Sequence, residues 1–206
     1  MKYITHFLLL IILTVSSLAN AEVRTFKKAT MGFQISNPHD LNWFDPEERE
    51  EAKKMSKTAK GNGGNTAKLL LALGYKKDDI AEGAISITYL DHFDRTKPLR
   101  FFVGNLVNKI RKIESDDVII NGEYVRTEIS GVPALYYKVA PVYPNPEKLN
   151  YRVNAHFIAF KHQDKMFMLQ SGVNVYSRIG QDKMEIEFEK FHEIFKDTAG
   201  TIVLND

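Results

Sequence analysis

One stretch near the C-terminus constrains the fold most strongly, because a strand pattern and a helix pattern follow one another there. Apolar residues occupy every second position of residues 151–159, which is the period of a β-strand. Residues 162–165 form a polar break, and extended apolar spacing resumes over residues 166–175. Residues 182–197 then carry an apolar face at helical spacing, made of Met184, Phe188, Phe191 and Phe195. These patterns predict a long β-hairpin followed by an amphipathic helix, with the other strands paired beside the hairpin.

The boundaries of this last helix are also predicted. Asp182 stands three residues before Glu185, which is the spacing of a capping box, so Asp182 is expected to cap the N-terminus. Gly200 is expected to end the helix, and residues 201–204 to form a final edge strand. The glutamates are expected mainly on the solvent side, which favours a solvated face over acid–base work by Glu185, Glu187, Glu189 and Glu193.

Two further helices are predicted earlier in the chain. Residues 96–113 have one continuous apolar face, formed by Leu99, Phe102, Val103, Leu106, Ile110 and Ile113. This helix is expected to dock on a sheet. A mostly polar surface helix is predicted to begin at Asp45 and to run to residue 60, because Asp45 suits the N-cap and Pro46 suits the first helical position.

The remaining segments are predicted to be strands and loops. Residues 69–73 are leucine-rich and suit a buried strand or a helix, and the glycines that bracket them favour a strand. Other strands are expected over residues 32–36, 84–90, 118–128 and 134–139. Asn121-Gly122 looks like a turn inside the third of these, and the proline-rich residues 141–146 are expected to form an exposed loop.

The first 21 residues are predicted to be a cleavable export signal. Lys2 supplies the positive charge, residues 7–15 form the apolar run, and Ala19-Asn20-Ala21 matches the cleavage pattern. The run is too short to span a bilayer, which takes about 20 residues. Cleavage after Ala21 would leave residues 22–206 as one globular domain, periplasmic or secreted, with no integral membrane span. The chain has no cysteine, so its stability must come from the core and not from disulfides.

Charge and motifs argue against several classes of function. Lys and Arg number 28 against 26 Asp and Glu, and a net charge of +2 gives no field that would recruit nucleic acid. The histidines lack metal-binding spacing, no Gly-x-Ser-x-Gly elbow occurs, and the glycines of residues 61–65 are not followed directly by the lysine of a P-loop. The sequence therefore predicts no catalytic residue, no cofactor and no metal site.

Asp91-His92-Phe93-Asp94 is the densest polar group. A metal or acid–base role there would need partners from elsewhere, such as His39-Asp40. A turn with a helix-capping aspartate is the favoured interpretation.

Aromatic residues in predicted loops form the candidate interaction surface: Trp43, Phe44 and Tyr143. Exposed aromatic side chains on loops are suitable anchors for a protein partner. For Trp43 the alternative, that it folds back on the sheet, is favoured over an interface.

The order of elements resembles that of the PsbP-like superfamily, named for an extrinsic subunit of photosystem II and shared by small exported bacterial proteins. The resemblance spans about residues 26–204 and rests on Gly32-Phe33-x-Ile35-Ser36-x-Pro38, on Ile129-Ser130-Gly131-Val132-Pro133-Ala134, and on the hairpin and closing helix. It implies an α/β (α+β) fold, with an antiparallel sheet sandwiched between helices. It also implies a binding or assembly module more than an enzyme, and carries over no residue with a chemical role.

The sequence thus predicts a non-enzymatic exported accessory or interaction protein of the bacterial cell envelope, with an envelope protein as partner. The alternative is a small-molecule- or lipid-binding module, or an enzyme, with a pocket between sheet and helix. Phe157, Phe167 and Met168 are candidates to line that pocket, although the core is the favoured place for each.

Overall fold

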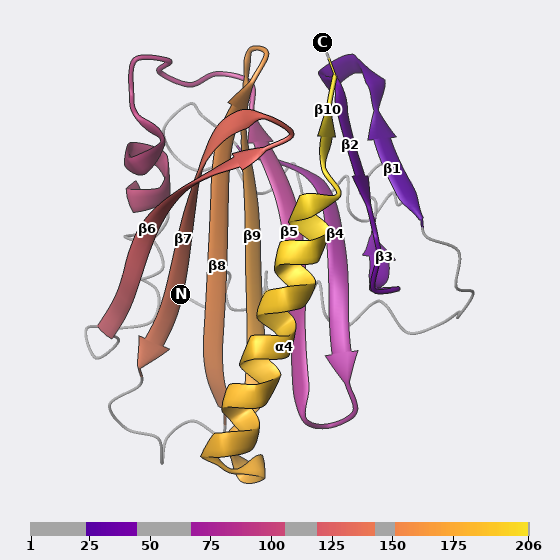
Figure 1. The fold of residues 1–206 in the computed structure, drawn as a ribbon, viewed down its shortest axis with the longest axis vertical. Helices are drawn as coiled ribbons and strands as arrows, with labels where there is room; N and C mark the ends of the chain where they lie inside the picture. The colour runs from indigo at the N-terminus through magenta and orange to yellow at the C-terminus, as the bar shows by residue number, and fades with distance from the viewer. Residues whose placement is uncertain (1–23, 45–66, 106–118, 143–150, 206) are drawn as a thin grey trace.

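The computed structural model describes residues 24–44, 67–105, 119–142 and 151–205, which form two antiparallel sheets and two helical segments (Figure 1). The strands are β1 (Thr25–Lys28), β2 (Phe33–Ser36), β3 (Asn42–Phe44), β4 (Lys68–Lys77), β5 (Ala81–Leu90), β6 (Ile119–Ile129), β7 (Val132–Val142), β8 (Tyr151–His162), β9 (Lys165–Tyr176) and β10 (Val203–Leu204). Short 3-10 helices occur at η1 (Ala29–Met31) and η2 (Ser177–Ile179), and the long helix is α4 (Gln181–Gly200). Residues 99–105 are also helical. The predicted α+β class is confirmed.

The large sheet is built around the predicted hairpin. Its seven strands lie in the order β3-β4-β5-β9-β8-β7-β6, and β8 and β9 pair from Tyr151↔Tyr176 to His162↔Lys165. Gln163 and Asp164 form the turn between them, within the polar break. A smaller three-stranded sheet has the order β1-β2-β10, so the final strand is an edge strand as predicted.

Both faces of the large sheet are covered, because successive side chains of a strand point to opposite faces. On one face Phe160, Phe167 and Leu169 form a core with Phe191 and Phe195 of α4. On the other face a smaller core joins the helical residues 99–105 to the sheet through Val103, Phe157, Ala159, Met166 and Met168. Figure 1 shows α4 lying across the large sheet. The predicted sandwich of sheet between helices is therefore confirmed.

Residues 69–73 are part of β4, so the strand interpretation is confirmed for this leucine-rich segment. The predicted helix of residues 96–113 is helical from residue 99 to residue 105, and the rest lies outside the described residues. The predicted polar helix of residues 45–60 and the predicted export signal of residues 1–21 also lie outside them.

The turn predicted at Asn121-Gly122 is wrong, because β6 runs through these residues without a break. Gly122 faces Val139, and a side chain at position 122 would collide with the Tyr137 ring and the Lys138 carbonyl. The glycine marks close packing here and not a reversal of the chain.

The loop predicted from Pro141 is wrong at its start, because β7 continues to Val142. Pro141 lies opposite Ile120, and the pairing of β7 with β8 ends at Val139. Counting from the pair Ile129–Val132 that closes the β6–β7 turn, Pro141 falls at a position that makes no ladder bond with β6. Proline, which lacks an N–H, is therefore tolerated there.

The capping prediction for Asp182 is also wrong. The N-cap of α4 is Gly180, no side chain caps the helix, and Asp182 lies in its first turn. An acidic residue there still interacts favourably with the helix dipole. Gly200 ends α4 as predicted.

Candidate functional site

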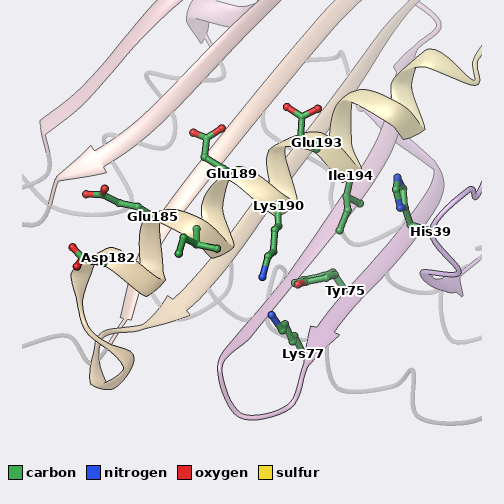
Figure 2. A pocket seen from close by; sticks show the side chains of 10 residues that line it. His39, Tyr75, Lys77, Asp182, Glu185, Glu189, Lys190, Glu193 and Ile194 are labelled. Atoms are coloured by element: carbon green, nitrogen blue, oxygen red, sulfur yellow. The ribbon is translucent and has the colours of Figure 1, made fainter.

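An open groove runs along α4, on the side that faces β4 (Figure 2). Its volume is about 1010 Å³. Apolar side chains form part of its wall: Tyr75 on β4, and Ile186 and Ile194 on α4. Ile186, in the second turn of α4, is 53% exposed, a large exposed fraction for an isoleucine on a helix that packs on a sheet. We call this feature the α4 groove.

Acidic side chains follow the α4 groove along the helix. Asp182, Glu185, Glu189 and Glu193 are spaced so that they share one helical face. Figure 2 shows Glu185, Glu189 and Glu193 on the opposite side of α4 from Lys190. At the outer margin Lys138 lies 3.5 Å from Glu189, and Lys196 lies 3.2 Å from Glu193. All three glutamates are exposed, as predicted.

Glu187 departs from the solvated face predicted for the glutamates, because its side chain is only 8% exposed. Lys77 of β4 donates to its Oε1 at 2.6 Å, and Lys190 donates to the same oxygen at 3.0 Å. Burial alone would raise the pKa of this carboxyl, but the two lysines outweigh that effect and hold the pKa below its usual value. The carboxylate offsets one of the two lysine charges. The acidic side chains that line the groove outnumber the lysines, so its net charge is acidic.

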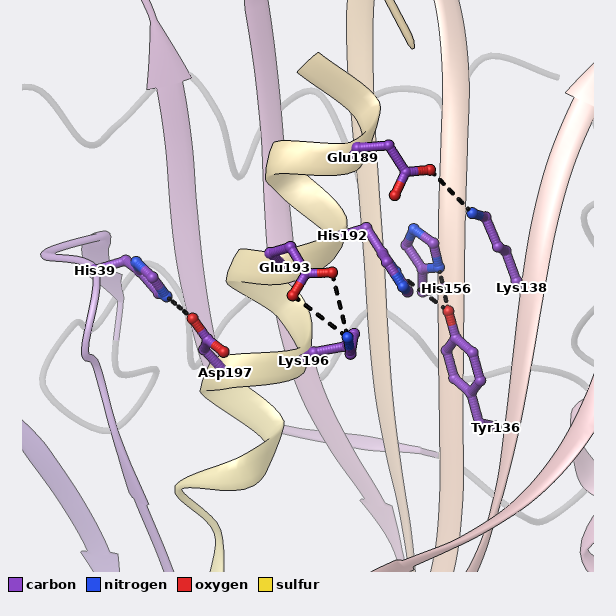
Figure 3. Close-up of polar contacts among 9 residues, drawn as sticks. All are labelled: His39, Tyr136, Lys138, His156, Glu189, His192, Glu193, Lys196 and Asp197. Carbon is purple, nitrogen blue, oxygen red and sulfur yellow. Dashed lines mark hydrogen bonds and ion pairs between the residues drawn. The ribbon is translucent and has the colours of Figure 1, made fainter. Parts of the chain in front are cut away.

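A polar cluster lies between α4 and the sheet, formed by the half-buried Tyr136 of β7, the buried His156 of β8 and the half-buried His192 of α4 (Figure 3). The Tyr136 hydroxyl is 2.8 Å from His156 Nδ1 and 3.3 Å from His192 Nδ1. A hydroxyl carries one proton, so it donates to one imidazole and accepts from the other. The rings of His156 and His192 lie 4.6 Å apart, and Phe195 stacks on His156 at 5.5 Å.

Burial controls the ionisation of this cluster. His156 is fully buried, and desolvation lowers its pKa to about 3, with further lowering by His192 and Lys138. Burial also lowers the pKa of His192 and raises that of Tyr136. His156 Nε2 and the hydroxyl of Ser171, its cross-strand neighbour, are both buried without a hydrogen-bond partner. All three rings are therefore neutral at pH 7, and the cluster connects α4 to β7 and β8 through uncharged hydrogen bonds.

The candidate interaction residues are placed differently from one another. Trp43 lies half-buried on β3, opposite Leu73, with its ring 6.2 Å from that of Phe26, so it folds back on the sheet. Phe44 was expected in a loop, but it ends β3 and is only 4% exposed. A buried side chain offers no anchor to a partner. Tyr143 lies outside the described residues.

Asp91 and Asp94 have structural roles at the end of β5. Asp91 forms ion pairs with Lys68 and, at 3.3 Å, with Lys165. Asp94 accepts bonds from the backbone N–H and the hydroxyl of Thr96, so the turn of the favoured interpretation is present. The helical residues begin only at 99, so Asp94 does not cap them. His39 bonds Asp197 of α4 at 2.9 Å, so it is not brought to this turn (Figure 3). Within the described residues no group of three or more His, Asp or Glu side chains could hold a metal ion.

Phe157, Phe167 and Met168 belong to the core and line no pocket between sheet and helix. Phe167 lies on the α4 face, whereas Phe157 and Met168 lie on the opposite face. The groove and the polar cluster had only weak signals in the sequence. His156 falls among the polar positions that alternate with the apolar residues of β8, and nothing in the sequence pairs it with Tyr136 or His192.

Comparison with known proteins found a similar structure but no similar sequence. No protein-family model matches the chain, and no curated protein matches it. The solution structure of cyanobacterial PsbP (CyanoP) from Synechocystis sp. PCC 6803 is similar, with a TM-score of 0.55. The match covers 92% of this chain and 96% of that chain, at 9% sequence identity. The chain has a PsbP-like fold.

The PsbP-like resemblance predicted from the order of elements is thereby confirmed as a resemblance of fold. At 9% identity the match assigns no site residue, so any function has to be inferred from the side chains of this chain itself. Among its described residues, no helix is both long and apolar enough to cross a membrane.

Proposed function

We propose that this PsbP-like domain is a non-enzymatic, exported accessory protein of the bacterial cell envelope, periplasmic or secreted, which binds a protein partner through the α4 groove. The observation that carries the proposal is the exposed Ile186 in a groove bordered by acidic side chains. The export signal predicted for residues 1–21 supports the compartment, and the PsbP-like fold is consistent with an accessory role.

The chemistry of the groove selects the partner. Ile186, Ile194 and Tyr75 offer apolar contact, and the acidic row offers charge to a basic segment. Lys77 and Lys190 share one carboxylate, Glu187, so together these three groups leave one positive charge, fewer than the negative charges of the acidic row. The fitting partner is therefore an envelope protein that presents a basic amphipathic segment.

A cross-linked pull-down from the host envelope tests this, with residues 22–206 as bait. One stoichiometric partner is expected, and Ile186→Ser is expected to reduce its recovery by about tenfold or more, as for an interface anchor. Val203→Ser is the matched control, since Val203 is 40% exposed on β10 and lies outside the groove. Equal loss with both variants, or with neither, contradicts the groove as the docking site. An empty pull-down counts against the interaction role itself.

A second function, binding of a small amphiphilic anion, is favoured by an adjoining cavity of about 540 Å³ beside the start of α4, which shares Ile186 and Lys190 with the α4 groove. Its apolar residues are Ile80, Ile179 and Ile186, and its basic residues are Arg178, Lys183 and Lys190. Glu187 also lines it and pairs with Lys190, which leaves Arg178 and Lys183 to bind an anion. A fatty acid would place its chain on the isoleucines and its carboxylate among the cations. A rise in melting temperature with laurate, absent with dodecanol and reduced by Lys183→Gln, supports this function. Equal responses to the acid and the alcohol contradict it.

A further inference from the structure

The outer edge of β6 is open in the part of the chain that the structure describes. β6 is the last strand of the large sheet and pairs with β7 alone (Figure 1). The exposed side chains along it are Glu123, Val125, Arg126, Thr127 and Glu128, and Val125 is 44% exposed. Unpaired backbone groups on such an edge are a template for another strand.

The turn that follows β6 determines which backbone groups point outward. Ser130 and Gly131 have φ values of 51° and 77°, as in a type I′ turn, so Ile129 and Val132 form the hydrogen-bonded pair that closes the hairpin. Hydrogen-bonded and non-hydrogen-bonded pairs alternate along an antiparallel ladder. The N–H and C=O groups of Arg126 and Glu128 therefore point away from β7, toward the free edge.

These outward groups belong to residues of opposite charge, which makes the edge complementary to itself. In an antiparallel pair of two β6 strands with Thr127 opposite Thr127, Arg126 lies opposite Glu128 of the other copy, and Glu128 lies opposite Arg126. Both are hydrogen-bonded positions, so each pair adds an ion pair to its backbone bonds. On the other face of the paired strands, Val125 lies opposite Ile129 of the second copy, so an apolar residue faces an apolar residue.

We propose that β6 is a self-association edge, where a second copy of this chain pairs antiparallel across a two-fold axis at Thr127. Neighbouring registers are less favourable. A two-fold axis at Arg126 sets two arginines opposite each other, and one at Val125 sets Arg126 opposite Tyr124 and Glu128 opposite Gly122, with no ion pair. The pairing joins two large sheets into one continuous sheet.

The dimer is expected to be weak and dependent on concentration. One strand pair buries less than the roughly 1,200 Å² of a standard interface, so the dissociation constant should lie in the range of about 10 µM to 1 mM. Charged side chains on an edge can instead protect it against pairing. A chain that stays monomeric at high concentration would have a protected edge, and that result would overturn the proposal.

Sedimentation velocity on residues 22–206, from about 10 µM to about 1 mM, tests the proposal. Arg126→Glu alone and Glu128→Arg alone each place like charges opposite one another and are expected to weaken dimerisation by about tenfold. The combined exchange restores opposite charges and is expected to return the dissociation constant to within about threefold of the original. Lys76→Glu is the control, an exposed reversal on β4 that changes the net charge as Arg126→Glu does.

Circular dichroism of each variant checks that the fold is kept. Restoration by the combined exchange is specific to the Thr127 register, because no other register brings Arg126 opposite Glu128. The assignment is overturned if the single charge reversals leave the dissociation constant of the dimer unchanged, or if the protein with both exchanges stays monomeric.

Discussion

His156 is the residue whose ionisation the fold controls most strongly. It is fully buried between Phe195 and Tyr136, and burial lowers its pKa from 6.5 to about 3. The unfolded chain therefore takes up a proton at this residue at higher pH than the folded chain does. The stability that the neutral ring contributes is fully present above pH 6.5 and is lost as the pH falls from 6.5 toward 3. His192, whose pKa is also lowered, adds a loss of the same sign.

Acidification is expected to destabilise the protein through these histidines. The free energy of unfolding, measured by urea titration between pH 7.5 and pH 4, should fall below pH 6.5 by up to about 1.4 kcal/mol per pH unit through His156, with a smaller loss through the half-buried His192. His156→Phe keeps an aromatic ring in the stack and should make this pH dependence shallower. Ile158→Val, on the same strand, should cost roughly 1 kcal/mol at every pH and leave the slope unchanged. An unaltered slope in His156→Phe would contradict the assignment.

The individual contacts of the candidate site were the part that the sequence could not predict. The alternation of side chains along a strand shows which face of the sheet each one occupies. It places His156 on the face opposite to that of Ala155 and Phe157. It does not state which distant residue lies across from it. Tyr136, His156 and His192 are brought together by the packing of α4 on β7 and β8, and the partner of the buried Glu187, Lys77, comes from the distant strand β4.

At the scale of the element, Gly122 in β6 shows how packing between strands can override a local turn signal. Backbone atoms of β7 and the Tyr137 ring approach its Cα so closely that a methyl group would collide with them. Asn-Gly is a strong turn signal, yet here the dipeptide lies inside a strand of eleven residues. The requirement for glycine comes from the packing of Tyr137 against Tyr124, whose ring centroids lie 4.4 Å apart.

Two glycine-to-alanine substitutions should therefore have opposite effects. Gly122→Ala is expected to lower the free energy of unfolding by roughly 1–3 kcal/mol, since the strand must shift to admit the methyl group. Gly104→Ala lies in the helical segment, where the nearest atom to a new Cβ is the Tyr124 hydroxyl at 3.7 Å. It should raise the stability by about 0.5–1 kcal/mol through helix propensity. Urea unfolding of both variants measures this, and equal effects would contradict the packing argument.

Elements with strong periodicity were predictable, and their ends were not. The β8–β9 hairpin and α4 follow from patterns that repeat over several turns or strand residues. Asp182 had the spacing of a cap, but Gly180, two residues earlier, takes the N-cap position and α4 begins at Gln181. Pro141 suggested a loop because proline cannot donate to a ladder. It is tolerated in β7 because the pairing with β8 has already ended at Val139, and the local sequence does not show where that pairing ends.

At the scale of the molecule, the C-terminal residues join the two sheets. Asn205 N–H donates to Gly32 at 2.8 Å, Leu204 N–H donates to the Ser130 hydroxyl at 3.2 Å, and Thr201 bonds Ser36 of β2. The Asn205 carbonyl accepts from Gln163 and lies 3.1 Å from His162 Nε2 in the β8–β9 turn. This short segment therefore contacts both sheets and two hairpin turns.

Deleting residues 201–206 is expected to loosen the small sheet before the large one. The deletion removes the buried Ile202, which is 4% exposed, and the pairing of β10 with β2. Loss of that isoleucine alone should lower the free energy of unfolding by roughly 2–5 kcal/mol. In hydrogen exchange, amides of β1 and β2 should lose protection more than amides at the centre of β8 and β9, whose ladder stays intact.

Two point variants separate the contributions of this segment. Ile202→Ala keeps the backbone and should reproduce most of the lost stability, because the side chain belongs to the core shared by both sheets. Val203→Ser changes an exposed residue of β10 and should stay within about 0.5 kcal/mol of the original protein. Uniform loss of protection across both sheets in the truncated chain would show that they unfold as one unit. In that case the C-terminal segment would stabilise the whole domain and would not serve mainly to hold the small sheet in place.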